Sequence, residues 1–228
     1  MCFHVASPTS QQLRAFVHNE YQVKDFESFF HVSGFAFPPM PVLTADGEIR
    51  PMNWGLIPPW VKDEATANDI RSKTLNAKSE TIYDLPSFKA SAGSKRCIIF
   101  INGFFEWQHQ GTETIPYYIY TDGQPFALAG LWSSWTNRET GEIHETCTII
   151  TTKANALMEN IHNTKKRMPV VLQQEKWAAW LDNKSTKETI LDLMQPLPEG
   201  ILHAHKISKL ITSRTQSSNV PEVQLPLK

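Results

Sequence analysis

Short runs of apolar and β-branched residues fill the middle of the chain and predict strands rather than long helices. Turn signals such as GTETIP and DGQP separate several of these runs, which favours antiparallel neighbours joined by tight turns. The predicted strands span 52–57, 96–101, 104–109, 116–121, 125–131 and 146–152, with two more near 168–172 and 201–207.

Helical spacing of apolar residues is confined to short segments on either side of this block. Thr9 or Ser10 can cap a helix over 10–20, and similar spacing recurs three times after the last long strand. These later helices are predicted over 153–160, 173–182 and 185–194.

The segment FAFPPMP, residues 35–41, contains three prolines in seven positions. Proline removes a backbone donor and restricts the residue before it, so this composition excludes a helix. We expect an extended connection laid over the core.

Strands in a central block with helices around them predict an α+β fold. A length of 228 residues allows one large domain or two small ones, but no repeat, low-complexity tract or Gly/Ser linker divides the chain. We expect one domain over 1–228, with the segment SSNVPEVQLPLK at 217–228 as a C-terminal tail.

The charge balance limits the kinds of partner. The 22 Lys and Arg against 23 Asp and Glu give a net charge of −1, so any contact with a polyanion must be a local patch. The longest apolar run is about five residues, from Cys97 to Ile101, far short of the 18 or so that a membrane helix needs. The N-terminus has no signal-peptide pattern, so we expect a cytoplasmic protein without a membrane partner.

The three cysteines, Cys2, Cys97 and Cys147, form neither an even set nor a C-x-x-C pair. This count argues against a disulfide scaffold and against a cysteine-rich zinc site. We therefore expect free thiols, no metal and no cofactor.

Cys2 directly follows the initiator methionine, and aminopeptidases generally remove a methionine that precedes a small residue. Cys2 would then carry a thiol of pKa about 8.5 beside an α-amine of about 7.7 to 8.0, both partly nucleophilic near neutrality. Such a 1,2-aminothiol condenses with an aldehyde to an imine and then to a thiazolidine ring. From this residue alone, a chance occurrence of cysteine is the alternative.

Three other clusters carry candidate chemistry. Glu106 lies between two aromatic residues at the end of an apolar strand, where burial would raise its pKa, although the side chain could also face solvent. His162 stands where a helix should end and a buried strand begin, but a lone histidine is more often structural. Asn76 and Lys78 stand where a loop feeds a short helix, a position that also suits a plain cap.

Taken in order, these clusters resemble the SRAP family, the SOS-response-associated peptidase-like proteins that shield abasic sites in DNA. The matching motifs are MC at the N-terminus, WGLIPPW at 54–60, NAKSET at 76–81, NGFFEW at 102–107, and IH followed by RMPVVL. The resemblance covers almost the whole chain. It implies a single SRAP domain with a mostly antiparallel, β-barrel-like core flanked by helices, and a cleft for single-stranded DNA.

The resemblance also implies a reaction. Family members join the ring-opened aldehyde of an abasic site to an N-terminal cysteine, so the resemblance implies a sensor that forms a thiazolidine DNA–protein crosslink. Cys2 would supply the amine and then the thiol, and Asn76 would orient the Cys2 backbone. Glu106 would shuttle protons and assist removal of any leader peptide, and His162 would act as general acid on the sugar oxygen and in crosslink reversal.

The expected partner is single-stranded DNA that contains abasic sites. We expect a monomer to bind it through a local patch of side chains. Trp60 resembles the family tryptophan that stacks beside the lesion, with a core tryptophan as the alternative. Phosphate contacts are expected from Lys78, Lys89, Arg167 and the hydroxyl of Thr151, and a weaker one from His4.

Three departures from the family pattern affect these expectations. The common start MCGR reads MCFH, so a basic side chain becomes His4, which is largely neutral at pH 7. The family's YNxAP segment reads SGFA at 33–36. Four residues instead of one separate His162 from Arg167, so the role of His162 requires that this insertion bulge outward.

Other readings of the same residues remain open. An N-terminal-nucleophile amidohydrolase would use Cys2 as a thiolate and turn over a small amide. A non-catalytic module that binds single-stranded nucleic acid would not need Cys2 at all. A zinc site from Cys2, His4, His203 and His205 lacks the usual ligand spacing.

Overall fold

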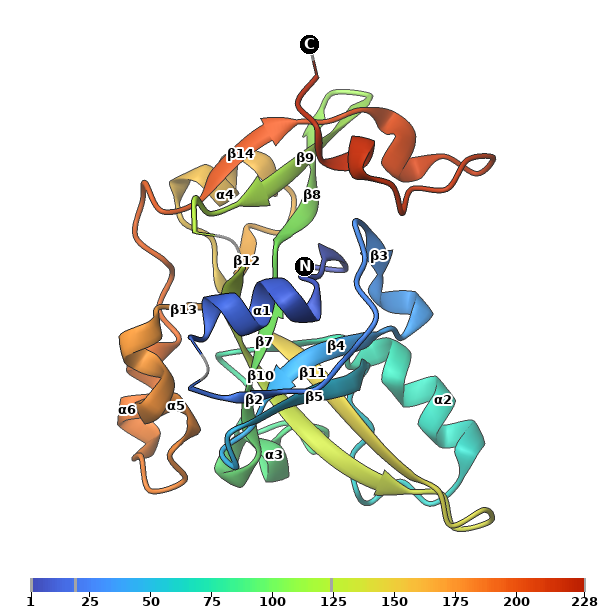
Figure 1. Cartoon of the computed structure of the whole chain (residues 1–228), viewed down its shortest axis with the longest axis vertical. Coiled ribbons are helices and arrows are strands. Elements are labelled where there is room, and N and C mark those ends of the chain that lie inside the picture. Colours follow the sequence, from blue (N-terminus) through green and yellow to red (C-terminus); the bar gives the residue numbers. More distant parts are fainter. Residues whose placement is uncertain (1, 19, 124, 228) are drawn as a thin grey trace.

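Five strands close into a barrel, which lies in the lower half of the molecule as drawn in Figure 1. In the computed structural model, which describes residues 2–18, 20–123 and 125–227, these strands pair in a ring because the first also pairs with the last. The expected α+β fold with a β-barrel-like core is thus confirmed. The ring consists of β11 (Ile143–Lys153), β10 (Phe126–Thr136), β7 (Arg96–Ile101), β4 (Pro39–Leu43) and β5 (Glu48–Trp54).

Short strands pair with the ends of individual barrel strands. They pair with β5, β11 and β10, and two of the pairings are parallel. These strands are β2 (Gln22–Val23), β6 (Asn76–Lys78), β12 (Arg167–Pro169) and β13 (Val171–Leu172).

A second, five-stranded antiparallel sheet lies above the barrel in Figure 1. The N-terminal strand occupies an interior position in it, with a neighbour on each side. In spatial order the strands are β14 (His203–Lys206), β9 (Glu113–Tyr120), β8 (Gly103–Gln110), β1 (His4–Ala6) and β3 (Val32–Ser33).

Short helices surround the sheets. The first begins at the predicted position, where Thr9 and Gln12 form a capping box, but it ends at Phe16 before the left-handed His18 (φ 48°). The α-helices are α1 (Ser10–Phe16), α2 (Glu64–Lys73), α3 (Lys89–Ser94), α4 (Ala156–Ile161), α5 (Trp177–Leu181) and α6 (Lys187–Leu193). Single 3-10 turns form η1 (Gly34–Ala36), η2 (Gln174–Lys176), η3 (Lys209–Thr212) and η4 (Pro221–Gln224).

The proline-rich segment does not form the expected extended connection over the core. It contributes η1 and then β4, a strand of the barrel itself. β4 pairs with β7 only through Val42 and Leu43, so Pro39 and Pro41 leave no gap in that ladder. On the other side Pro41 faces Pro51, and neither residue has an N–H to donate.

The C-terminal segment, expected as a tail, packs against the body. Asn219 Oδ1 accepts a hydrogen bond from the backbone N–H of Phe30 at 2.8 Å, and Gln224 Nε2 donates to the Phe30 carbonyl at 2.8 Å. Val223 is fully buried. The 3-10 turn η4 therefore joins the rim of the second sheet.

Two buried tryptophan side chains donate hydrogen bonds to backbone carbonyls of neighbouring elements. Trp54 Nε1 donates to the carbonyl of Leu75 at 2.7 Å, and Trp180 Nε1 donates to the carbonyl of Cys97 at 2.8 Å. Both tryptophans are fully buried, and the hydrogen bond of each indole N–H compensates for its removal from water.

Cys97 and Cys147 are buried free thiols. Within the described residues, none of the helices has the length and apolar character needed to traverse a bilayer.

Gly103 begins β8 where the backbone approaches an aromatic ring. A Cβ at this position would lie 2.4 Å from ring atoms of Tyr118, closer than any real contact. We expect Gly103→Ala to destabilise the protein by about 1 to 3 kcal/mol, as overpacking does in cores. Urea unfolding measures this loss. The control, Gly93→Ala in α3, meets no atom within 4 Å and should be neutral or slightly stabilising; equal effects from both variants would contradict the prediction.

Candidate active site

The pairing of β1 with β8 places Cys2, which precedes β1, beside the strand that carries Glu106. β1 runs antiparallel to β8, with His4 opposite Phe105 and Val5 opposite Phe104. Cys2, two residues before His4, is only 1% exposed and belongs to the main hydrophobic cluster. Burial raises the pKa of its thiol, so the sulfur is protonated at neutral pH.

Asn76 contacts Cys2 from the barrel. It lies on β6, which pairs in parallel with β11, so the expected loop before a short helix is wrong at this point. Its Nδ2 donates to the Cys2 carbonyl at 2.8 Å. Its Oδ1 is buried and accepts no hydrogen bond from the described residues. Asn76 therefore fixes the Cys2 backbone and keeps one acceptor available beside it.

Glu106 lies inside the molecule rather than in solvent. Its side chain, on β8, is 7% exposed, which excludes the alternative of a solvent-facing carboxylate. Burial raises the pKa of Glu106 to about 7. Near neutral pH this group can therefore both accept and donate a proton.

His162 faces Glu106 from the end of α4. Its Nδ1 lies 2.9 Å from the Arg167 carbonyl, which can only accept, so Nδ1 carries the proton. Nε2 then points to Glu106, 3.9 Å from Oε2. Burial lowers the pKa of His162. Residues 164–166 are exposed, so the insertion bulges outward as the predicted role requires.

Phe3 lines two pockets. The first, of about 420 Å³, is also lined by Glu106 and His162, and the second, of about 450 Å³, is also lined by Asn76. The first is also lined by His4, Trp107, His109 and Lys165, and the second by Leu75, Lys78, Leu85 and Phe88. Groups that could act on Cys2 thus lie on both sides of the N-terminal segment.

Three of the predicted DNA contacts have accessible positions. Trp60 is 49% exposed and donates through Nε1 to the Pro86 carbonyl at 3.2 Å, so it is not a core tryptophan. Lys78 is exposed at the second pocket, and Lys89 is exposed at the start of α3.

The other three residues predicted to contact DNA are buried or paired in this structure. Thr151 is fully buried, and its hydroxyl donates to the Ala77 carbonyl at 3.4 Å. Arg167 is paired with Glu80, with only 12% of its side chain exposed. His4 Nδ1 lies 2.9 Å from Nε2 of His31, and burial lowers the pKa of His4 to about 4, so it carries no charge for a phosphate.

Sequence reasoning missed two of these partners. His31 reaches His4 through the β1–β3 pairing and also lies 2.7 Å, through Nδ1, from the Ser218 hydroxyl. No local pattern marks it, because the contacts join distant segments. Glu80 stands within the NAKSET motif, and only its place in this motif could have marked it as a site residue.

The zinc alternative is inconsistent with the sheet order. Cys2 precedes β1, whereas His203 and His205 lie on β14, with β8 and β9 between the two strands. Three strand spacings of about 4.8 Å put β14 roughly 14 Å from β1, well beyond the span of one metal ion. Within the described ranges, no three His, Cys, Asp or Glu side chains gather in a way that could hold a metal.

Known structures share this architecture. A crystal structure of a protein from Bacteroides thetaiotaomicron superposes with a TM-score of 0.90 at 37% sequence identity, and it covers 100% of both chains. A crystal structure of a protein from Bordetella bronchiseptica has a TM-score of 0.78 at 24% identity over 91% of this chain and 100% of that one, which shows the same fold.

Curated relatives and a family model agree with the structural match. YoqW of Bacillus subtilis (strain 168), named an abasic site processing protein, is 39% identical over 205 residues, 86% of this chain and 87% of that protein. HMCES of Xenopus tropicalis, with the same descriptive name, is 35% identical over 193 residues, 75% of this chain and 55% of that protein. The model of the SOS response associated peptidase (SRAP) family matches residues 1–214. The chain therefore belongs to the SRAP family.

Proposed function

We propose that this protein recognises abasic sites in single-stranded DNA and forms a covalent crosslink with them through Cys2. The names of its relatives support abasic sites as the substrate. The observation that carries the proposal is the hydrogen bond from Asn76 to the Cys2 carbonyl, in a site that also holds a carboxyl group of pKa about 7. A buried nucleophile beside a group that exchanges protons at neutral pH suits imine chemistry.

The first step joins the Cys2 amine to the sugar aldehyde, after Met1 has been removed. The nitrogen lone pair attacks the aldehyde carbon as the C=O π bond breaks, and one amine proton passes through the Glu106 carboxylate to the carbonyl oxygen, which gives a carbinolamine. The remaining N–H proton then passes through Glu106 to the hydroxyl, which leaves as water while the C=N bond of the imine forms. If residues precede Cys2, the same carboxylate would take a proton from the water that hydrolyses the peptide bond, which releases the amine.

The second step closes the ring. The Cys2 sulfur adds to the imine carbon and its proton moves to the nitrogen, which gives a thiazolidine, so the whole reaction releases one water. Burial raises the pKa of the thiol, so the sulfur keeps its proton until the imine offers an electrophile.

His162 donates a proton to the sugar ring oxygen when the sugar opens. It also donates a proton to the leaving oxygen during crosslink reversal. Because Nδ1–H is bonded to the Arg167 carbonyl, the transferable proton belongs on Nε2, the atom that faces Glu106. The two side chains can thus exchange a proton before His162 donates it to the ring oxygen.

The direct test mixes purified protein, with its N-terminal mass recorded, with a single-stranded oligonucleotide that carries one abasic site. A denaturing gel should show a heat-stable band shifted by the full protein mass. If protein confirmed to begin at Cys2 gives no such band, the proposed chemistry is wrong. Turnover of a small amide instead would identify the amidohydrolase alternative.

Lys78 is proposed to contact a backbone phosphate. We expect Lys78→Ala to weaken binding to an oligonucleotide with a tetrahydrofuran site and to reduce the slope of log affinity against log salt by about 0.7, the value for one phosphate on a single strand. Fluorescence anisotropy between 50 and 200 mM salt measures both. The control is Lys184→Ala, in the exposed loop between α5 and α6. An unchanged slope for Lys78→Ala would exclude this contact.

A further inference from the structure

Glu80 and Arg167 form a bidentate ion pair next to His162. Arg167 Nη1 donates to Glu80 Oε1 at 2.5 Å, and Nη2 donates to Glu80 Oε2 at 2.9 Å. Nη2 also donates to the backbone carbonyl of Thr151 at 2.6 Å. With three such bonds and little exposure, the Arg167 side chain is fixed in one orientation.

The backbone of the same Arg167 holds His162. Its carbonyl is the acceptor for Nδ1–H, and this bond favours the Nδ1–H tautomer, which directs Nε2 toward Glu106. A shift of this carbonyl would therefore free the ring to turn or to change tautomer. The orientation of His162 toward Glu106 depends on how firmly Arg167 is held.

The loop between His162 and Arg167 gives little support of its own. Residues 164–166 are exposed, and Lys166 has a left-handed backbone with φ 50°, which is unfavourable for a residue with a Cβ. Its N–H donates to the His162 carbonyl at 2.8 Å and closes the turn. The second end of the loop is held from outside it: Arg167 pairs with Lys153 in the β11–β12 ladder, and the Lys166 carbonyl accepts a hydrogen bond from the Ala154 N–H at 3.0 Å. Glu80 adds a contact that fixes the Arg167 side chain.

We propose that Glu80 is a positioning residue for His162, acting through its ion pair with Arg167. The segment 76–81 would then arrange two parts of the site, because Asn76 contacts Cys2 and Glu80 fixes the carbonyl that holds His162. The catalytic consequence rests on the proposed function, whereas the geometry belongs to the free protein and is tested without any reaction.

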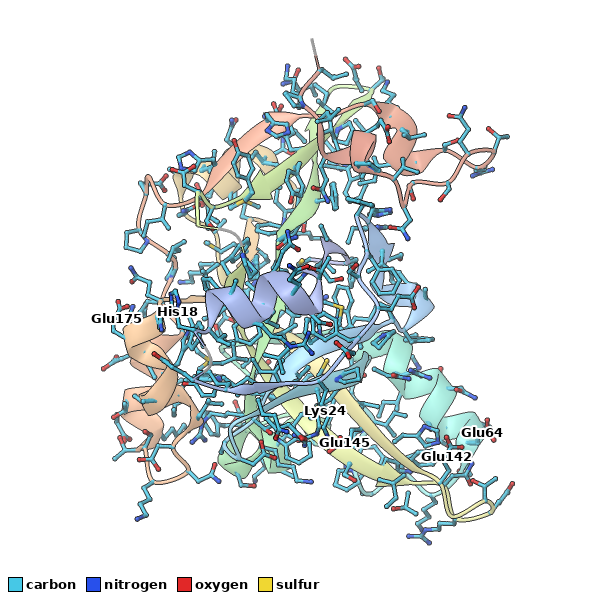
Figure 2. The ribbon with its side chains drawn as sticks, viewed as in Figure 1. His18, Lys24, Glu64, Glu142, Glu145 and Glu175 are labelled. Atoms are coloured by element: carbon cyan, nitrogen blue, oxygen red, sulfur yellow. The ribbon has the colours of Figure 1, made fainter. Side chains whose placement is uncertain are left out.

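The first measurement is the 15N spectrum of the His162 ring in the free protein. We expect a single Nδ1–H tautomer in the wild type and a mixture of tautomers in Glu80→Gln. The matched control is Glu145→Gln, which breaks another bidentate pair: Arg50 Nε and Nη2 each lie 2.9 Å from a Glu145 oxygen. Glu145, labelled in Figure 2, lies near the hairpin end of β11, away from Arg167. A wild-type tautomer in Glu80→Gln would overturn the proposal.

Arg167→Lys provides a second variant if Glu80→Gln folds poorly, because lysine keeps the charge but lacks the planar fork. It should give the same mixture of tautomers. Retention of the single Nδ1–H tautomer in both variants would exclude the positioning role.

Kinetics supply an independent readout. We expect Glu80→Gln to slow crosslink reversal about 10-fold, and to add nothing when combined with His162→Ala, since the two residues would act as one unit. A further 10-fold loss in the double variant would show that Glu80 does not act through His162. If the wild type forms no crosslink, the proposed function fails, and the tautomer measurement alone decides the role of Glu80.

Discussion

Cys2→Ala protein should give no heat-stable band with an oligonucleotide that contains one abasic site. Alanine keeps an α-amine but has no sulfur, so an imine can form and hydrolyse while ring closure is impossible. Cys2→Ser should likewise form only a transient imine, which reduction with borohydride would trap. Denaturing gels run with and without reduction measure the two species separately.

The control for this result is Cys147→Ala, which removes another fully buried thiol. It should leave the yield of crosslink unchanged, provided that circular dichroism shows a folded protein. A wild-type amount of stable adduct from Cys2→Ala would remove Cys2 from the mechanism and assign the bond to another nucleophile.

Glu106→Gln should slow crosslink formation by about 10² to 10⁴-fold in single-turnover experiments, the range that general acid–base catalysis contributes. Glutamine has nearly the same shape, so the site should remain intact while the proton shuttle is lost. An unchanged rate would exclude Glu106 from the chemistry. A matched control is Gln108→Glu, two residues further along β8, which adds a carboxyl group at another buried position.

The same residue predicts a pH dependence. Because the pKa of Glu106 is raised to about 7, the carboxylate that accepts the amine proton forms as the pH rises through this value. The wild-type rate should therefore rise between about pH 6 and 8. Glu106→Gln should lose this inflection and keep only the one that comes from the α-amine, near 7.7 to 8.0. Identical profiles for the two proteins would contradict the assignment.

The buried carboxyl should also affect stability. A pKa raised on folding means that the stabilising contribution of the protonated group is complete below its ordinary value of 4.5 and is lost as the pH rises through about 7. At about 1.4 kcal/mol for each pKa unit, the loss is about 3 kcal/mol. Unfolding in urea at pH 5 and 8 should show this decline in the wild type and not in Glu106→Gln.

Short runs of apolar and β-branched residues predicted the long strands well, because such runs reflect burial directly. β7 spans the predicted residues, the predicted strands 104–109 and 146–152 lie within β8 and β11, and the predicted strand 125–131 begins one residue before β10. The helix α2 was not predicted, because it buries only Ala67 and so has no apolar stripe. The strand β6 was missed since its partner β11 comes about 70 residues later in the chain.

The candidate site was predictable to the extent that its residues stand in motifs. Cys2, Asn76, Glu106 and His162 come together as the family resemblance implied, although their roles remain to be tested. The DNA contact of Arg167 stays a prediction. Its ion pair with Glu80, 87 residues away, was not foreseen, because nothing in the sequence near Arg167 signals that pairing. The burial of His4 and Thr151 was not foreseen for a related reason, since burial depends on the assembled sheets, and their DNA contacts also stay predictions.

The interior position of β1 has a mechanical consequence. A DNA strand joined to Cys2 would pull on a β-strand that is hydrogen-bonded to β3 on one side and β8 on the other. Tension on the DNA would therefore load two ladders at once, and the N-terminus could not peel away as an edge strand does. Release of β1 would therefore require both ladders to break, so the junction with DNA should withstand force better than one at an edge strand.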